Sequence, residues 1–159
     1  MSEKDWVIHE VAIQKTGVFD LNGIMKTIRS WINLNNFDFH ETENESDSKI
    51  HTIKWEIEKK MDDYTKYVIG FTFKISDQKK VKVKNKQLYE GKLSIKFNSR
   101  KITDYQEKWE GKPLKKFFRG IYDMFIQGDK TQRQSKDLKE LTYDIYNQTK
   151  AFLNLQKFN

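Results

Sequence analysis

The chain has 159 residues, a formal net charge of +7 and no cysteine. The lack of cysteine excludes disulfides, thiolate catalysis and cysteine-ligated zinc or iron–sulfur sites. The length predicts a single domain over residues 1–159. A polar start and the absence of an apolar run of about 20 residues predict a cytoplasmic protein without a membrane span.

Aromatic residues make up 14% of a chain that is only 36% apolar, so we expect a core of few but large side chains. Alternating apolar residues predict a first strand over residues 6–15, which Thr16 and Gly17 end. Asp20 is a suitable N-cap for a helix. The apolar residues that follow it recur at helical spacing: Leu21, Ile24, Met25, Ile28, Trp31 and Ile32.

A run of strands follows this helix. Period-two alternation is clearest where Ile53, Trp55 and Ile57 alternate with charged residues, a pattern typical of an antiparallel strand with one buried face. We predict turns at residues 44–48, 62–63, 77 and 85–91. The first strand and this run together predict about six strands, the later ones over residues 37–43, 50–59, 67–75, 80–86 and 92–97.

Two helices are predicted to close the chain. Pro113 fits the first position of a helix over residues 113–125, and residues 128–134 read as a polar connector. Ser135 is the predicted cap of the last helix. Strands in sequence with helices at the ends define an α+β fold, in which a curved antiparallel sheet packs against the last helix.

This order of elements resembles the helix-grip architecture of START-like proteins, in which a curved sheet wraps a long C-terminal helix. The chain departs from that pattern, with one helix rather than two after the first strand and two rather than one at the end. Residues 103–113, 117–123 and 146–155 also resemble uncharacterised small archaeal proteins. The first resemblance implies a helix-grip fold. The second implies an archaeal setting and no particular activity.

Motifs for catalysis are missing from the chain. It contains no GxSxG, SxxK, GxGxxG, P-loop or HExxH pattern, and its histidines are His9, His40 and His51. We therefore favour a protein that is not an enzyme, with an enzyme as the third alternative, and predict no cofactor and no metal site. A weak divalent-metal site, with His51 across a hairpin from His40, is the minority alternative.

The leading hypothesis is a binding module for a small apolar ligand. Apolar pockets with a few polar groups bind small molecules, and a curved sheet that grips a helix leaves space for such a pocket. A filled core is the alternative interpretation of the same aromatic side chains. The predicted cavity-lining residues are Trp55, Tyr67, Phe71, Phe73, Phe97 and Trp109.

The second hypothesis is binding of RNA or another polyanion, as in an accessory protein of ribonucleoproteins. Between Gln78 and Lys101 there are nine basic residues and one acidic residue. Lysines that alternate along a strand can contact phosphates without reading bases, although lysine also protects edge strands from unwanted pairing. The predicted phosphate-binding residues are Lys80, Lys82, Lys84, Lys92, Lys96, Lys115, Lys116 and Arg119.

Overall fold

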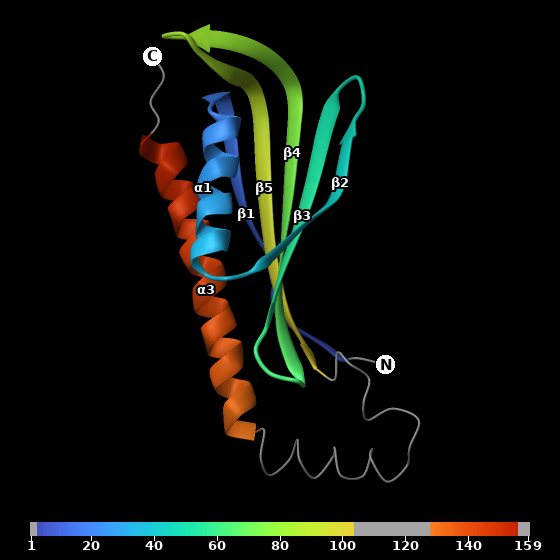
Figure 1. Ribbon diagram of the computed structural model, residues 1–159. Helices are drawn as coiled ribbons and strands as arrows, with labels where there is room; N and C mark the ends of the chain where they lie inside the picture. The colour runs from blue at the N-terminus through green and yellow to red at the C-terminus, as the bar shows by residue number, and fades with distance from the viewer. Residues whose placement is uncertain (1–2, 104–127, 156–159) are drawn as a thin grey trace.

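The computed structural model describes residues 3–103 and 128–155, which form one five-stranded sheet and two helices (Figure 1). The predicted α+β class is confirmed. In chain order the elements are β1 (Glu3–Phe19), α1 (Leu21–Leu34), β2 (Asp38–Ser46), β3 (Ile50–Lys60), β4 (Thr65–Val83), β5 (Lys86–Thr103) and α3 (Gly128–Leu155).

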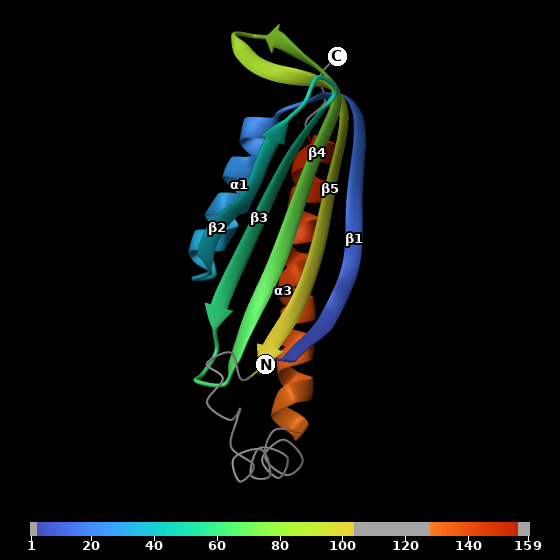
Figure 2. The same cartoon turned by 90° about the vertical axis from the view of Figure 1, so that its right-hand side faces the viewer.

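The strands lie in the order β1-β5-β4-β3-β2, and every neighbouring pair is antiparallel. Both helices pack on the same side of the sheet, which we call the covered face. Figure 2 looks onto the other side, where the strands lie in front of the helices. We call this side the open face, because none of the described helices covers it.

Period-two alternation produces the core, as the sequence predicts. Trp55, Phe71 and Phe97 lie opposite one another on neighbouring strands, and all three side chains are buried on the covered face. Residues between them, such as Thr72 and Lys96, point to the open face. A slip of one residue in register would expose this whole apolar set.

The two helices complete the core and contact each other. Ile24, Ile28 and Ile32 of α1 are fully buried at helical spacing. The indole nitrogen of Trp31 donates a hydrogen bond to Asp144 Oδ2 of α3 at 2.8 Å, which joins the helices. The buried stripe of α3 contains Leu138, Thr142, Ile145, Thr149 and Leu153. Each threonine hydroxyl in this stripe donates to the carbonyl four residues earlier.

The prediction of about six strands is wrong, because two predicted strands are one. Asp77 has a φ of 55° and lies in a bulge of β4, where three residues of β4 advance while β5 advances by two. Such a bulge bends a strand without ending it. The chain reverses instead at Lys84 and Asn85, whose φ angles of 52° and 65° form a two-residue hairpin turn. Residues 85–91, predicted as a turn, therefore belong mostly to β5.

Two other predicted boundaries are also wrong. β1 continues through Gly17, which adopts a φ of 118° inside the strand, and ends at Phe19. Residues 128–134, predicted as a connector, form the first turns of α3. The predicted helix over residues 113–125 lies outside the described residues.

The sheet bends sharply at one level across three strands. Gly17 of β1 pairs with Gly91 of β5, and the bulge at Asp77 of β4 lies beside them. A Cβ at Gly91 would lie 2.6 Å from the carbonyl oxygen of Ser76, so only glycine fits this close approach. Beyond the bend the hairpin of β4 and β5 curls over the end of α1 (Figure 1).

Within residues 3–103 and 128–155, neither helix combines the length and apolar character that a membrane crossing requires.

Candidate functional site

The aromatic residues predicted to line a cavity lie inside the core. Trp55, Tyr67, Phe71, Phe73 and Phe97 are at most 5% exposed and belong to one apolar cluster. Two ring pairs in this set pack edge to face, with centroids 4.9 Å apart for Trp55 and Phe73 and 5.5 Å apart for Phe71 and Phe97. Trp109 lies outside the described residues. The structure thus gathers these side chains, and their ligand-binding role stays a prediction.

The predicted basic surface is divided between two faces and a turn. The β4 bulge places Lys80 opposite Tyr89, which packs on the core, whereas Lys92 and Lys96 point to the open face. Lys82 lies on the same side as Lys80, opposite Gln87. Lys84 occupies the hairpin turn. The remaining predicted residues, Lys115, Lys116 and Arg119, lie outside the described residues.

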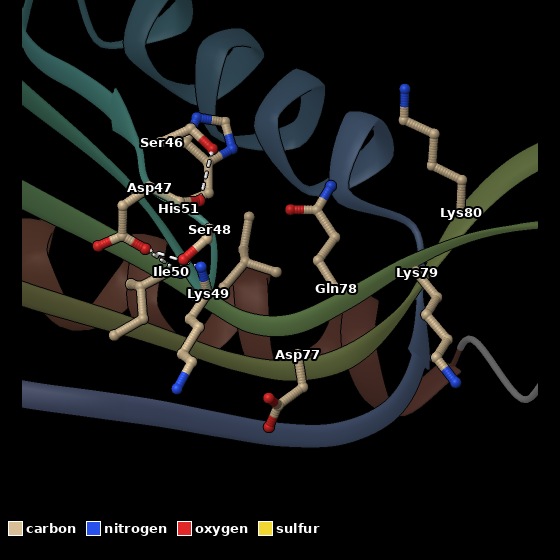
Figure 3. Close-up of a pocket in the computed structure, with 11 residues that line it drawn as sticks. Ser46, Asp47, Ser48, Lys49, Ile50, His51, Asp77, Gln78, Lys79 and Lys80 are labelled. Carbon is tan, nitrogen blue, oxygen red and sulfur yellow. Dashed lines mark hydrogen bonds between the residues drawn. The ribbon is translucent and has the colours of Figure 1, made fainter.

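A large pocket of about 530 Å³ opens between the β2–β3 turn and the β4 bulge (Figure 3). Asp47 stabilises the turn that forms one wall, because its Oδ1 accepts the backbone N–H groups of Lys49 and Ile50 at 2.8 Å. These hydrogen bonds lower the pKa of Asp47 below its ordinary value. Figure 3 shows Lys79 and Lys80 directed to opposite sides of β4. The cations of this pocket therefore do not converge on one point.

A second groove, of about 310 Å³, crosses the open face just below the bend. Strand register arranges most of its side chains in two cross-strand rows. Row one contains Thr16, Lys92, Ser76 and Ile50, taken from β1, β5, β4 and β3. Row two lies two residues further along the strands and contains Gln14, Ser94 and Lys74.

The groove therefore alternates ammonium groups with neutral hydrogen-bond donors. Lys92 lies between the hydroxyls of Thr16 and Ser76, and Lys74 lies next to Ser94. Lys15 also borders the groove, but it lies opposite Leu93, so its side chain is on the covered side of β1. The described residues that line this groove include no Asp or Glu.

Ion pairing separates this groove from most of the open face. Among the described residues, neither Lys74 nor Lys92 has a carboxylate within 4.0 Å. Further from the bend four cations of the open face do have such partners, at 3.0–3.5 Å, whereas Lys4 and Lys60 have none within the described residues. These pairs are Lys54–Glu43, Lys66–Glu58, Lys96–Glu10 and Arg100–Glu56.

The titratable groups with the clearest shifts lie on the covered face. Burial, and then the carboxylate of Asp137, raise the pKa of the Tyr67 phenol, whose hydroxyl donates to Asp137 at 3.0 Å. Burial lowers the pKa of Lys101, while Asp5 at 3.6 Å opposes that shift. Lys101 is buried on the covered face, on the opposite side of β5 from Arg100.

The histidines do not assemble into a shared site. His40 pairs with Glu56, whereas His51 pairs with Ser46 and its ring contacts Asn44 Oδ1 at 2.7 Å. His40 points to the open face and His51 to the covered face, so the two cannot bind one metal ion together. His9 stacks on Trp6 with ring centroids 5.6 Å apart.

Sequence reasoning missed most of the groove. It identified Lys92 but not Lys74, and none of the neutral donors. Alternation along β4 could have placed Lys74 and Ser76 on the open face, because both are out of phase with the buried residues of that strand. Strand order and register, which bring these residues beside Thr16 and Ser94, were needed for the rest.

Comparison with known proteins adds no family: no protein-family model and no curated protein sequence matches this chain.

Proposed function

We propose that this protein binds the phosphate groups of a polyanion, a nucleic acid in the first instance, in the groove of the open face. The observation that supports the proposal is that, within the described part of the chain, Lys74 and Lys92 have no carboxylate beside them, while four open-face cations further from the bend are paired. Lysine, serine, threonine and glutamine side chains are typical phosphate ligands of nucleic-acid-binding proteins.

The residue types favour contact with the backbone rather than with bases. Lysine acts on a phosphate as a point charge, which does not depend on base identity. Base recognition on a sheet uses exposed aromatic side chains for stacking, and the described lining of the groove contains none. We therefore expect binding with little sequence preference.

The small apolar ligand receives less support from the geometry. Such a ligand would have to separate rings that already contact one another, such as Phe71 and Phe97. Each displaced ring would lose its close-packed contacts. The archaeal kinship, the helix-grip relationship and the cytoplasmic setting stay predictions from the sequence.

The test is fluorescence anisotropy with a labelled single-stranded oligonucleotide over a range of salt concentrations. Two lysine contacts predict a slope of log affinity against log salt of about −1.4. The double variant Lys74→Glu/Lys92→Glu should abolish most binding. The control Lys26→Glu/Lys139→Glu makes the same charge change at exposed helix positions and should bind almost like the wild type.

Equal losses in the two double variants would show that net charge alone attracts the oligonucleotide, and would overturn the groove as the site. Absence of binding by the wild type at low salt would overturn the proposed function.

A further inference from the structure

The groove ends where the next row of the open face begins. Row three, two residues beyond row two, contains Ala12, Lys96, Thr72 and Lys54. Its composition is close to that of row one, with lysines beside a hydroxyl. Unlike Lys74 and Lys92, the two lysines of row three form ion pairs. Lys96 Nζ lies 3.5 Å from Glu10 Oε1, and Lys54 Nζ lies 3.0 Å from Glu43 Oε2.

Both carboxylates come from irregularities in the edge strands. Glu10 lies in β1 within the register shift between Ile8 and Val11. Glu43 borders the register shift that follows Glu41 in β2. Bulges re-aim side chains and are common beside functional sites. The two edge strands, at opposite sides of the sheet, thus each supply one carboxylate to the same row of lysines.

We infer that Glu10 and Glu43 set the length of the anion-binding site, restricting it to rows one and two. This inference rests on the proposed function. A carboxylate beside an ammonium group cancels its charge and repels an approaching phosphate, so a strand that continues past Lys74 gains nothing at Lys96 or Lys54. The ligand is therefore a short phosphate track, and a longer strand gains no contact with the paired cations of row three.

The structure allows this to be tested by a gain of binding. Both pairs are solvent-exposed, with side-chain exposures of 40% and 58% for Lys96 and Glu10 and of 47% and 29% for Lys54 and Glu43. Exposed pairs contribute little to stability, so Glu10→Gln/Glu43→Gln should fold normally. The matched control is Asp63→Asn/Glu140→Gln, which removes two exposed carboxylates elsewhere.

The measurement is anisotropy with oligothymidylates of about four and about twelve nucleotides. In the wild type the two lengths should show the same salt slope. In the double variant the longer probe should bind several-fold more tightly, and its slope should steepen by about 0.7 for each released lysine, about 1.4 in total. Glu10→Gln alone should give about half of that change.

The outcomes separate the inference from the proposed function. Suppose that the wild type binds through the groove but the salt slope of the longer probe is unchanged in Glu10→Gln/Glu43→Gln. That result would overturn the inference without affecting the proposed function. An equal gain in the control variant would overturn the inference too. Binding by the double variant but not by the wild type would support the inference and would overturn the proposed function for the wild-type protein. Failure of both proteins to bind would overturn both.

Discussion

Lys86 Nζ lies 2.6 Å from Asp20 Oδ2, and this contact joins the first residue of β5 to the N-cap of α1. The other carboxylate oxygen of Asp20 accepts the backbone N–H of Gly23 at 3.0 Å. Asp20 is 1% exposed, so one buried carboxylate both caps the helix and holds the curled hairpin of β4 and β5 above it. The sequence identified the cap but not its partner on the hairpin.

Substitution at Asp20 should separate these two roles. Asp20→Ala removes the cap and the ion pair, and the loss of an N-cap alone costs about 0.5–2 kcal/mol. Asp20→Asn keeps a capping oxygen and removes the charge that holds Lys86. We expect Asp20→Ala to lower the free energy of unfolding in urea more than Asp20→Asn does. Equal losses would mean that the cap contributes nothing beyond the ion pair.

Removal of a central aromatic ring should be costly. Phe71 is 1% exposed and contacts Phe97 in the middle of the sheet. Phe71→Ala should lower the free energy of unfolding by about 3–5 kcal/mol, because it leaves a cavity that the sheet cannot close. Lys82→Ala, at an exposed position of the same strand, is the control and should change stability by at most about 0.5 kcal/mol. Chemical denaturation followed by tryptophan fluorescence measures both.

Much of this core could be predicted from the sequence, because alternation alone assigns Ile53, Trp55 and Phe71 to one face. The number of strands could not be predicted from the sequence, because a residue in the left-handed conformation, as Asp77 is, can form either a turn or a bulge. Only the pairing of Lys79 with Glu90 beyond that point shows that β4 continues. Local propensity cannot distinguish the two, because the choice depends on a partner strand distant in sequence.

The bend should depend on its glycines. Gly91→Ala would place a methyl group 2.6 Å from the carbonyl oxygen of Ser76, which the paired strands hold in place. Gly17→Ala meets no atom within 4 Å but must adopt a φ of 118°. We expect each to cost about 1–3 kcal/mol, with the larger loss at Gly91, where crowding is the cause. A thermal unfolding series can rank them, and an unchanged Gly91→Ala would show that the bend does not require the close approach.

Alkaline pH should destabilise the protein through Tyr67. Its pKa is raised in the folded state, so between the unfolded pKa of about 10 and the folded one the unfolded chain binds fewer protons. Stability must then fall as pH rises above about 10. Tyr67→Phe should flatten that fall, and urea unfolding at several pH values checks it. A wild type and a Tyr67→Phe variant with parallel pH profiles would contradict the prediction.

The groove was less predictable than the core for a physical reason. Its residues come from four strands, and Thr16 and Ile50 share a row only because β1 lies next to β5. Charge density along the sequence pointed instead to Lys80, Lys82 and Lys84, which the bulge and the turn place away from Lys92. A cationic site depends on which lysines lack carboxylate partners, and that information lies in the register.

The strand order also has a consequence for how the chain folds as it is synthesised. β1 pairs with β5 along most of its length, and Glu3 lies opposite Thr103. β1 is synthesised before β5 and therefore waits, with Ile8 and Ile13 uncovered, until β5 has emerged. Contacts between such distant residues require a large loop to close first, which slows folding. A nascent chain arrested before β5 would present an unpaired apolar strand, which is the kind of segment that chaperones bind.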